Sequence, residues 1–214
     1  MISQTRSTQT MFVSLLVLIL MAGCSDNDKI TQPTDGGPLN NTEVNVLANF
    51  VSAYVEKDID AYTEVFDVEE FTFVFDRTDV ENDPDLNPTW GWPEELTSTK
   101  NMFSSALVLT VTVDFVLGDV EFARDSDLVP LEWRKIVVTE IELEIDTIDP
   151  DGGENIIYKV AGDRGMFFFG TYPDELIDGQ PRKRITEWRD IRVGLRPGLA
   201  VELNTWGQIK SVWN

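Results

Sequence analysis

Two stretches in the middle of the chain alternate hydrophobic and polar residues. In residues 107–117, one face would carry Leu107, Leu109, Val111, Val113, Phe115 and Leu117, and the other Val108, Thr110, Thr112 and Asp114. In residues 135–149, the hydrophobic set is Val137, Ile141, Leu143 and Ile145, opposed by Glu140, Glu142, Glu144 and Asp146. Because side chains alternate between the two faces of a strand, these patterns predict long antiparallel strands with one buried face.

The chain after residue 149 continues this pattern. The turn residues "DPDGGEN" from Asp149 predict that the next segment returns antiparallel as a strand. Gly162 and Gly165 within that segment indicate a bulge or bend. The segments "RITEWRDIRV" (184–193) and "WGQIKSVW" (206–213) predict two further strands.

Helical spacing dominates the region before these strands. Val44, Leu47, Ala48, Val51 and Val55 form one stripe of an amphipathic helix. A short second helix is predicted after Asp58, its N-cap, with Tyr62, Val65 and Phe66 buried, and a strand over residues 70–76 with Phe71, Phe73 and Phe75 on one face. An acidic loop then leads to a third helix, which begins near Pro93 and carries Leu96, Thr99, Lys100 and Phe103. The expected fold class is α+β, with two to three N-terminal helices packed on an antiparallel sheet.

The N-terminus predicts secretion and lipid attachment. The hydrophobic run over residues 11–22 is too short to span a bilayer, which needs about 20 residues, but it suits a signal peptide with Arg6 as its positive flank. Met21, Ala22, Gly23 and Cys24 resemble the lipobox of bacterial lipoproteins, which more often has Leu at the first position. The resemblance implies cleavage before Cys24 and a diacylglycerol on its sulfur. The alternative is an ordinary secretory signal with an accidental cysteine.

These features divide the chain into a signal peptide (1–23), a lipid-anchored flexible tether (24–42) and one folded domain (43–214). Ser25 after the cysteine, where inner-membrane lipoproteins carry Asp, implies sorting to the outer membrane of the bacterial cell envelope. The formal net charge of -21 argues against nucleic acid and anionic membrane surfaces as partners. Membrane association is expected through the lipid anchor.

Several segments of the domain resemble the nuclear transport factor 2-like (SnoaL-like, cystatin-like) superfamily. They are "FVSAYVEKDIDAYTEVFDVEEFTFVF", "GWPEELTSTKNMF", "ITEWRDI" and "TWGQIKSVW". The resemblance covers residues 43–214 and implies a cone-shaped domain, in which the helices pack into the concave side of a curved sheet and leave an apolar pocket. Members of the superfamily include isomerases, dehydratases, cyclases and domains that only bind. Family sheets often pair through their outer faces, which implies a homodimer as one form of this chain.

Catalysis in such a pocket requires a tuned acid–base group. Tyr54, Asp114, Tyr158 and Asp190 are the candidate pieces, as in members that resemble ketosteroid isomerase. Asp114 lies opposite the hydrophobic face of its strand. Asp190 shares strand parity with Trp188, so it would either face inward beside Trp188 or belong to an ordinary edge-of-sheet pattern. The chain has no histidine, which the dehydratase-like members use, and we assign no catalytic residue.

The loop over residues 83–94 carries oxygen ligands at the spacing of a calcium-binding loop. These are Asp83, Asp85, Asn87 and Glu94. Pro88 stands where such a loop requires glycine. We therefore expect a polar loop that caps a helix, with no metal and no cofactor.

Two tryptophans flank the start of the third helix. Trp90 and Trp92 would either close the core or form the rim of a pocket for a flat or sugar-like ligand. With Tyr54 and Trp188, they are the candidate contacts for a small apolar ligand. The expected function is a cell-envelope lipoprotein with a non-catalytic ligand-binding or accessory interaction domain. The alternative is a pocket enzyme of the isomerase or dehydratase type acting on a small apolar substrate.

Overall fold

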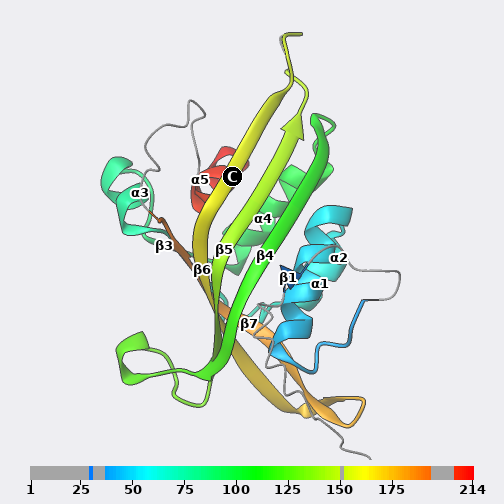
Figure 1. Ribbon diagram of the computed structural model, residues 1–214, viewed down its shortest axis with the longest axis vertical. Coiled ribbons are helices and arrows are strands. Elements are labelled where there is room, and N and C mark those ends of the chain that lie inside the picture. The colour runs from blue at the N-terminus through cyan, green and yellow to red at the C-terminus, as the bar shows by residue number, and fades with distance from the viewer. Residues whose placement is uncertain (1–28, 31–36, 150–151, 194–204) are drawn as a thin grey trace, which may run out of the picture.

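The fold is a mixed seven-stranded sheet with helices packed against it (Figure 1). The computed structural model describes residues 29–30, 37–149, 152–193 and 205–214. The strands are β1 Lys29–Ile30, β2 Thr72–Val74, β3 Thr89–Gly91, β4 Val108–Phe122, β5 Arg134–Thr147, β6 Ile156–Ile177 and β7 Gln180–Ile191. The helices are α1 Glu43–Glu56, α2 Ile59–Glu64, α3 Arg77–Asn82, α4 Trp92–Ser104 and α5 Trp206–Val212. The predicted α+β class is confirmed.

The sheet is built around an antiparallel meander. Strands β4, β5, β6 and β7 pair in sequence order, and β2 joins β7 in parallel before pairing with β3. The turn between β6 and β7 uses Asp178 and Gly179, both with positive φ. This is the backbone that a two-residue hairpin turn requires. The inner sides of these strands and the helices share one hydrophobic core.

The predicted faces hold over residues 111–117 of β4 and over residues 141–147 of β5. Leu107 and Leu109 are exposed and Val108 is buried, because the pairing with β5 shifts register between Val108 and Thr110. On β5, Ile136 and Val138 are fully buried while Val137 is only partly buried. Each register shift inserts a residue and moves the side chains beyond it to the other face.

The predicted bend in β6 is present. Gly162 has φ 76°, a conformation that side chains disfavour, and the pairing of β5 with β6 shifts register beside it. The bend falls near the middle of a strand of 22 residues. It gives the sheet part of its curvature, which is visible in Figure 1.

The first helices follow local sequence signals. Thr42 caps α1 by accepting a hydrogen bond from Asn45 N, and Asp58 caps α2 through Asp60 N and Ala61 N. The buried face of α1 is broader than the predicted stripe: Val46, Leu47, Phe50, Val51, Ala53 and Tyr54. Val44, Ala48 and Val55 are only partly buried, because Phe50 and Tyr54 turn the helix toward the aromatic core.

The prediction of a strand over residues 206–213 is wrong, because these residues form helix α5. Thr205 accepts a hydrogen bond from Gln208 N, and the Gln208 side chain accepts one from Thr205 N. This reciprocal capping box fixes the first helical turn. Helix α3 within the acidic loop was also not predicted.

Part of the segment expected to be a tether lies against the domain. Lys29–Ile30 pairs antiparallel with β4 at Val116 and Phe115, and Asn40 is buried. Cys24 and the predicted signal peptide lie outside the described residues. Among the residues that the structure describes, no helix is both long and apolar enough to cross a membrane.

Candidate functional site

The space between helices and sheet, where the resemblance implies a pocket, is filled by aromatic side chains. Those less than 2% exposed are Phe50, Tyr54, Tyr62, Phe66, Phe73, Phe115, Phe167, Phe169, Trp188 and Trp206. Phe50 touches Tyr54, Tyr62, Trp188 and Trp206 with ring centroids 5.0–5.9 Å apart. Such tilted and edge-on pairs are the favourable geometries for aromatic rings. The interior of this fold is therefore packed in this structure.

Helix α5 supplies part of that packing. Trp206 lies 5.0 Å from both the Tyr54 and Trp188 rings, and its indole N–H donates to the Tyr54 hydroxyl at 3.2 Å. A Cβ on Gly207 would come within 2.6 Å of the Phe75 ring, so the helix approaches β2 closely at this position. Helix α5 thus closes one side of the aromatic core.

A buried ion pair joins α5 to α4. Lys210 donates to Glu95 Oε1 on α4, and the Tyr62 hydroxyl donates to the same oxygen. The side chains of Glu95 and Lys210 are 0% and 3% exposed. Burial lowers the pKa of Lys210 to about 8, and burial together with the Glu95 carboxylate holds the pKa of Tyr62 well above its usual range.

A second acidic group lies at the N-terminal end of α5. Asp190 Oδ2 accepts a hydrogen bond from Gly207 N at 2.7 Å, and Asp79 accepts from Thr205 Oγ1 and from Gln208 Nε2. Burial raises the pKa of Asp190 to about 7, and the nearby carboxylates of Asp163 and Asp79 add to the rise. These carboxylates anchor α5 to β7 and α3.

Asp190 makes stability depend on pH. Its pKa is higher in the folded state than in the unfolded chain, so its contribution is complete below about pH 4 and is lost as pH rises through about 7. Asn in its place can still accept from Gly207 N but carries no charge. We expect Asp190→Asn to gain stability relative to wild type between pH 4 and pH 7. Urea unfolding at several pH values measures this gain, and a difference that does not change with pH would contradict it.

The predicted ligand contacts belong to the same core. Tyr54 and Trp188 are 1% and 0% exposed and meet through Trp206. Trp92 stacks on Tyr62 and packs on Phe66. Of the four predicted contacts, Trp90 is the one that lines either of the two surface hollows described in the following paragraphs.

The hollow at Trp90 has a volume of about 150 Å³ and lies between the 85–94 segment and the end of α5. Ligand pockets usually measure about 300–1,000 Å³. This hollow would hold a few water molecules or a very small ligand. A ligand role for the tryptophans stays a prediction.

The other predicted catalytic pieces are not brought together. Tyr158 on β6 pairs with Ile145 of β5, and Gly165 on β6 pairs with Asp190 of β7. Tyr158 is therefore separated from Asp190 by about 20 Å along β6. Asp114 is partly buried on the polar side of β4. Glu95, which was not among the predicted catalytic pieces, is the carboxylate that lies beside a buried tyrosine.

The 83–94 loop uses its oxygen atoms for local structure. Asp83 Oδ1 accepts from Asp85 N at 3.1 Å, and Glu94 Oε2 accepts from Gly91 N at 3.2 Å. Within the described ranges, no group of three or more Asp, Glu, Cys or His side chains is placed to hold a metal ion. The hydrogen bond from Gly91 N to Glu94 Oε2 is the predicted cap at the start of α4.

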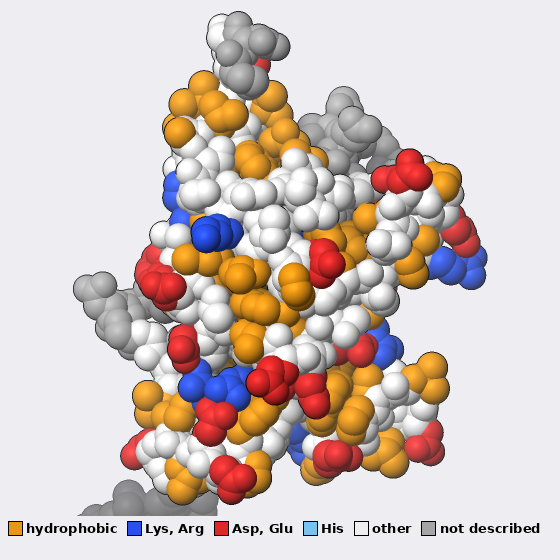
Figure 2. Space-filling view, turned by 180° about the vertical axis from the view of Figure 1, so that it is seen from behind, with side chains coloured by type: hydrophobic (Ala, Val, Ile, Leu, Met, Phe, Trp, Pro, Cys, Tyr) orange, Lys and Arg blue, Asp and Glu red, His pale blue; other side chains and the backbone are white. Residues whose placement is uncertain are grey.

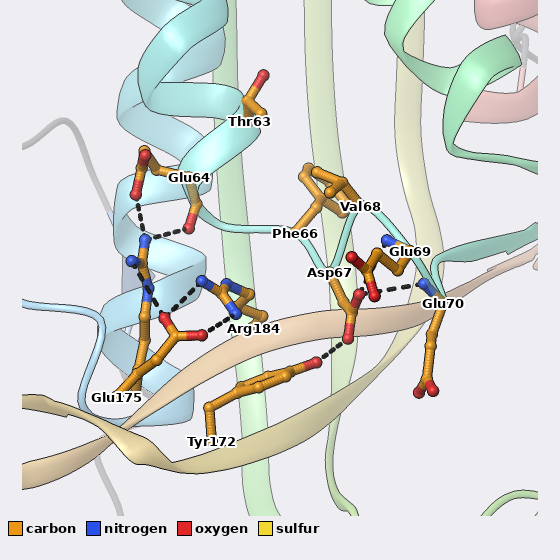
Figure 3. Close-up of a pocket in the computed structure, with 11 residues that line it drawn as sticks. Thr63, Glu64, Phe66, Asp67, Val68, Glu69, Glu70, Tyr172, Glu175 and Arg184 are labelled. Atoms are coloured by element: carbon orange, nitrogen blue, oxygen red, sulfur yellow. Dashed lines mark hydrogen bonds and ion pairs between the residues drawn. The ribbon is translucent and has the colours of Figure 1, made fainter.

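A larger hollow opens on the surface below α2, and we call it the α2 hollow (Figure 3). Its volume is about 610 Å³. It is lined by Thr63, Glu64, Phe66, Asp67, Val68, Glu69, Glu70, Tyr172, Glu175, Arg182 and Arg184. The acidic residues outnumber the two arginines, so the hollow presents an excess of negative charge.

Ion pairs and hydrogen bonds fix the floor of the α2 hollow. Glu175 accepts from both ends of the Arg184 guanidinium, at 2.9 and 2.6 Å, and Arg184 lies over the Tyr172 ring. Figure 3 shows Tyr172 directed toward Asp67, to which its hydroxyl donates. Arg182 pairs with Glu64 on α2. These contacts tie the β6–β7 hairpin to the segment after α2 and give the hollow a defined shape.

Comparison with known proteins gives limited information. The sequence matches no known protein-family profile and no curated protein sequence. Among solved structures, it is similar to a conserved protein from Planctomyces limnophilus, with 12% identity over 67% of this chain and 88% of the other, and a TM-score of 0.43. A protein from Kribbella flavida has 10% identity over 72% of this chain and 90% of the other, with a TM-score of 0.45.

A third similar structure is a hypothetical protein from Catenulispora acidiphila, described as having a ketosteroid isomerase-like fold and solved in complex with trimethylamine. It has 14% identity over 69% of this chain and 84% of the other, with a TM-score of 0.34. At these scores, neither family membership nor a ligand is transferred to this chain.

Proposed function

We propose that this chain is a lipid-anchored protein of the bacterial cell envelope whose domain works by binding rather than by catalysis. The observation that carries the proposal is the contrast between a packed interior and a defined surface hollow. Glu95, Tyr62, Lys210 and Asp190 border neither of the two hollows described above. These four residues are 0–4% exposed, so a substrate would reach them only after a rearrangement.

The α2 hollow is the proposed binding surface, and its chemistry favours a cationic partner such as a Lys- or Arg-containing protein segment. Arg182 and Arg184 are already paired within the hollow, with Glu64 and Glu175. Glu69 and Glu70 are exposed at its edge. On the face shown in Figure 2, acidic side chains are scattered and basic ones are few. The carboxylates of the α2 hollow would attract a basic segment of a partner protein.

An enzyme remains the second candidate because of one observation. Glu95 Oε2 is buried without a hydrogen-bond partner among the described residues, beside the Tyr62 hydroxyl that donates to Oε1. A buried carboxylate next to a tyrosine is a pair that acid–base enzymes use. Against this reading, Lys210 and the surrounding rings occupy the space where a substrate would lie.

The binding proposal is tested by charge removal at the α2 hollow. We expect basic peptides selected for binding to the full-length chain to bind at least several-fold more weakly to Glu69→Gln/Glu70→Gln, and more weakly in added salt. The matched control is Glu140→Gln/Glu142→Gln, which removes the same charge from β5. Fluorescence anisotropy measures both. Equal weakening by the two double variants would indicate a general charge effect and would reject the hollow.

The anchor proposal is tested at Cys24. We expect the wild-type chain in the membrane fraction, with acyl chains in its intact mass, because several buried chains at about 0.8 kcal/mol per methylene hold a protein stably. Cys24→Ser removes the attachment atom and should release the protein to the soluble fraction. A Cys24→Ser variant that stays in the membrane fraction would contradict the proposed lipid anchor.

A further inference from the structure

The ammonium group of Lys210 is enclosed by a carboxylate and two aromatic faces. Its Nζ pairs with Glu95 and lies 4.2 Å from the centroid of the Trp188 ring and 4.8 Å from that of Phe73. Tyr62 completes the enclosure through its hydrogen bond to Glu95. We call Glu95, Tyr62, Phe73 and Trp188 the ammonium box.

This enclosure has the chemistry of a site that recognises organic ammonium ions. Ring faces attract a cation within about 6 Å of the centroid, most strongly when the cation is removed from water. A buried carboxylate supplies the compensating charge. Glu95 Oε2 has no hydrogen-bond partner among the described residues, so the box keeps acceptor capacity that Lys210 does not use.

The occupant of the box belongs to a short helix with polar attachments. Helix α5 has seven residues and is tied down through Asp190 to Gly207 N, through Asp79 to Thr205, and through Ser98 to the Lys210 carbonyl. The walls of the box belong to α2, α4, β2 and β7, and none of the wall residues is part of α5. The lysine and the walls of its site therefore come from different segments of the chain.

We propose that the ammonium box is a binding site for a primary organic ammonium ion and that Lys210 is its internal occupant. An external ammonium ligand binds when the Lys210 side chain leaves the box. The box thus gives the domain a second binding site, which is independent of the lipid anchor and of the α2 hollow.

The test removes the internal occupant and supplies an external one. Lys210→Ala in the full-length chain deletes the atoms Cγ to Nζ, and n-propylammonium chloride supplies the same atoms. We expect the melting temperature of Lys210→Ala to rise by about 3 °C or more and to saturate with n-propylammonium concentration. Wild type, Lys210→Met and the exposed control Lys100→Ala should not respond at the same concentrations.

Two comparisons decide whether the response comes from the box. n-Propanol has the same shape without the charge, and Lys210→Ala/Glu95→Gln lacks the carboxylate charge; neither should give the saturable rise. If n-propanol stabilises Lys210→Ala as well as n-propylammonium does, or if neither does, the proposal is overturned. If Lys210→Ala is unfolded in buffer, n-propylammonium but not n-propanol should restore its near-ultraviolet circular dichroism, and failure to restore it also overturns the proposal.

Discussion

Phe73→Ala is expected to destabilise the domain by about 3–5 kcal/mol, as truncation of a buried aromatic side chain does. Phe73 is fully buried and packs on Phe75, Trp90 and Trp188 with ring centroids 4.8–5.7 Å apart. The loss would be much of the net stability of a domain of this size. Urea unfolding of the full-length chain measures it.

The control for this substitution is Phe122→Ala. Phe122 is 60% exposed at the end of β4, and the Arg134 guanidinium lies over its ring, 4.0 Å from the centroid. Its loss should cost less than about 1 kcal/mol, because little apolar area leaves contact with protein. Similar losses for the two variants would show that Phe73 does not lie in the core.

Lys210→Met is the second substitution with a large expected effect. It leaves the Glu95 carboxylate buried without its cation, which should cost about 3–5 kcal/mol. The double variant Glu95→Leu/Lys210→Met removes both charges and should recover much of the loss, because a buried ion pair can be replaced by apolar side chains at little cost. Urea unfolding of both variants measures the coupling. If Lys210→Met unfolds within about 1 kcal/mol of wild type, the pair is not a buried ion pair.

The sequence was sufficient for elements whose signals are local. The alternation over Val111 to Leu117 predicted the buried face of β4, and Asp58 marked the start of α2. It failed where hydrophobic residues occur on consecutive positions. Leu107, Val108 and Leu109 contain no alternation, so nothing in them records the register shift that exposes two and buries one.

The sequence of α5 contains signals that predict a helix. Thr205 and Gln208 have the spacing of a capping box, and Trp206, Ile209, Lys210 and Trp213 recur at helical intervals. The two turns of helix then carry Lys210 into the core.

The buried ion pair could not have been predicted from local patterns. Glu95 lies in the first turn of α4, where an acidic residue is explained by the helix dipole. Its cation, Lys210, is 115 residues away in the chain. The one available sign is that Glu95 shares helical spacing with the buried Thr99, Met102 and Phe103, which places it on the inner face of α4.

The central claim is that the interior of the domain is packed against small apolar compounds and that the proposed basic partner binds at the α2 hollow. The most direct measurement is a screen of small apolar compounds against the wild-type full-length chain, in which the melting temperature and tryptophan emission are followed together. The account predicts no compound that raises the melting temperature in a saturable way and also shifts the emission, because Trp188 and Trp206 are already buried and in contact. A compound that does both, and loses both effects with Trp188→Phe, would show an open internal pocket and would contradict the account.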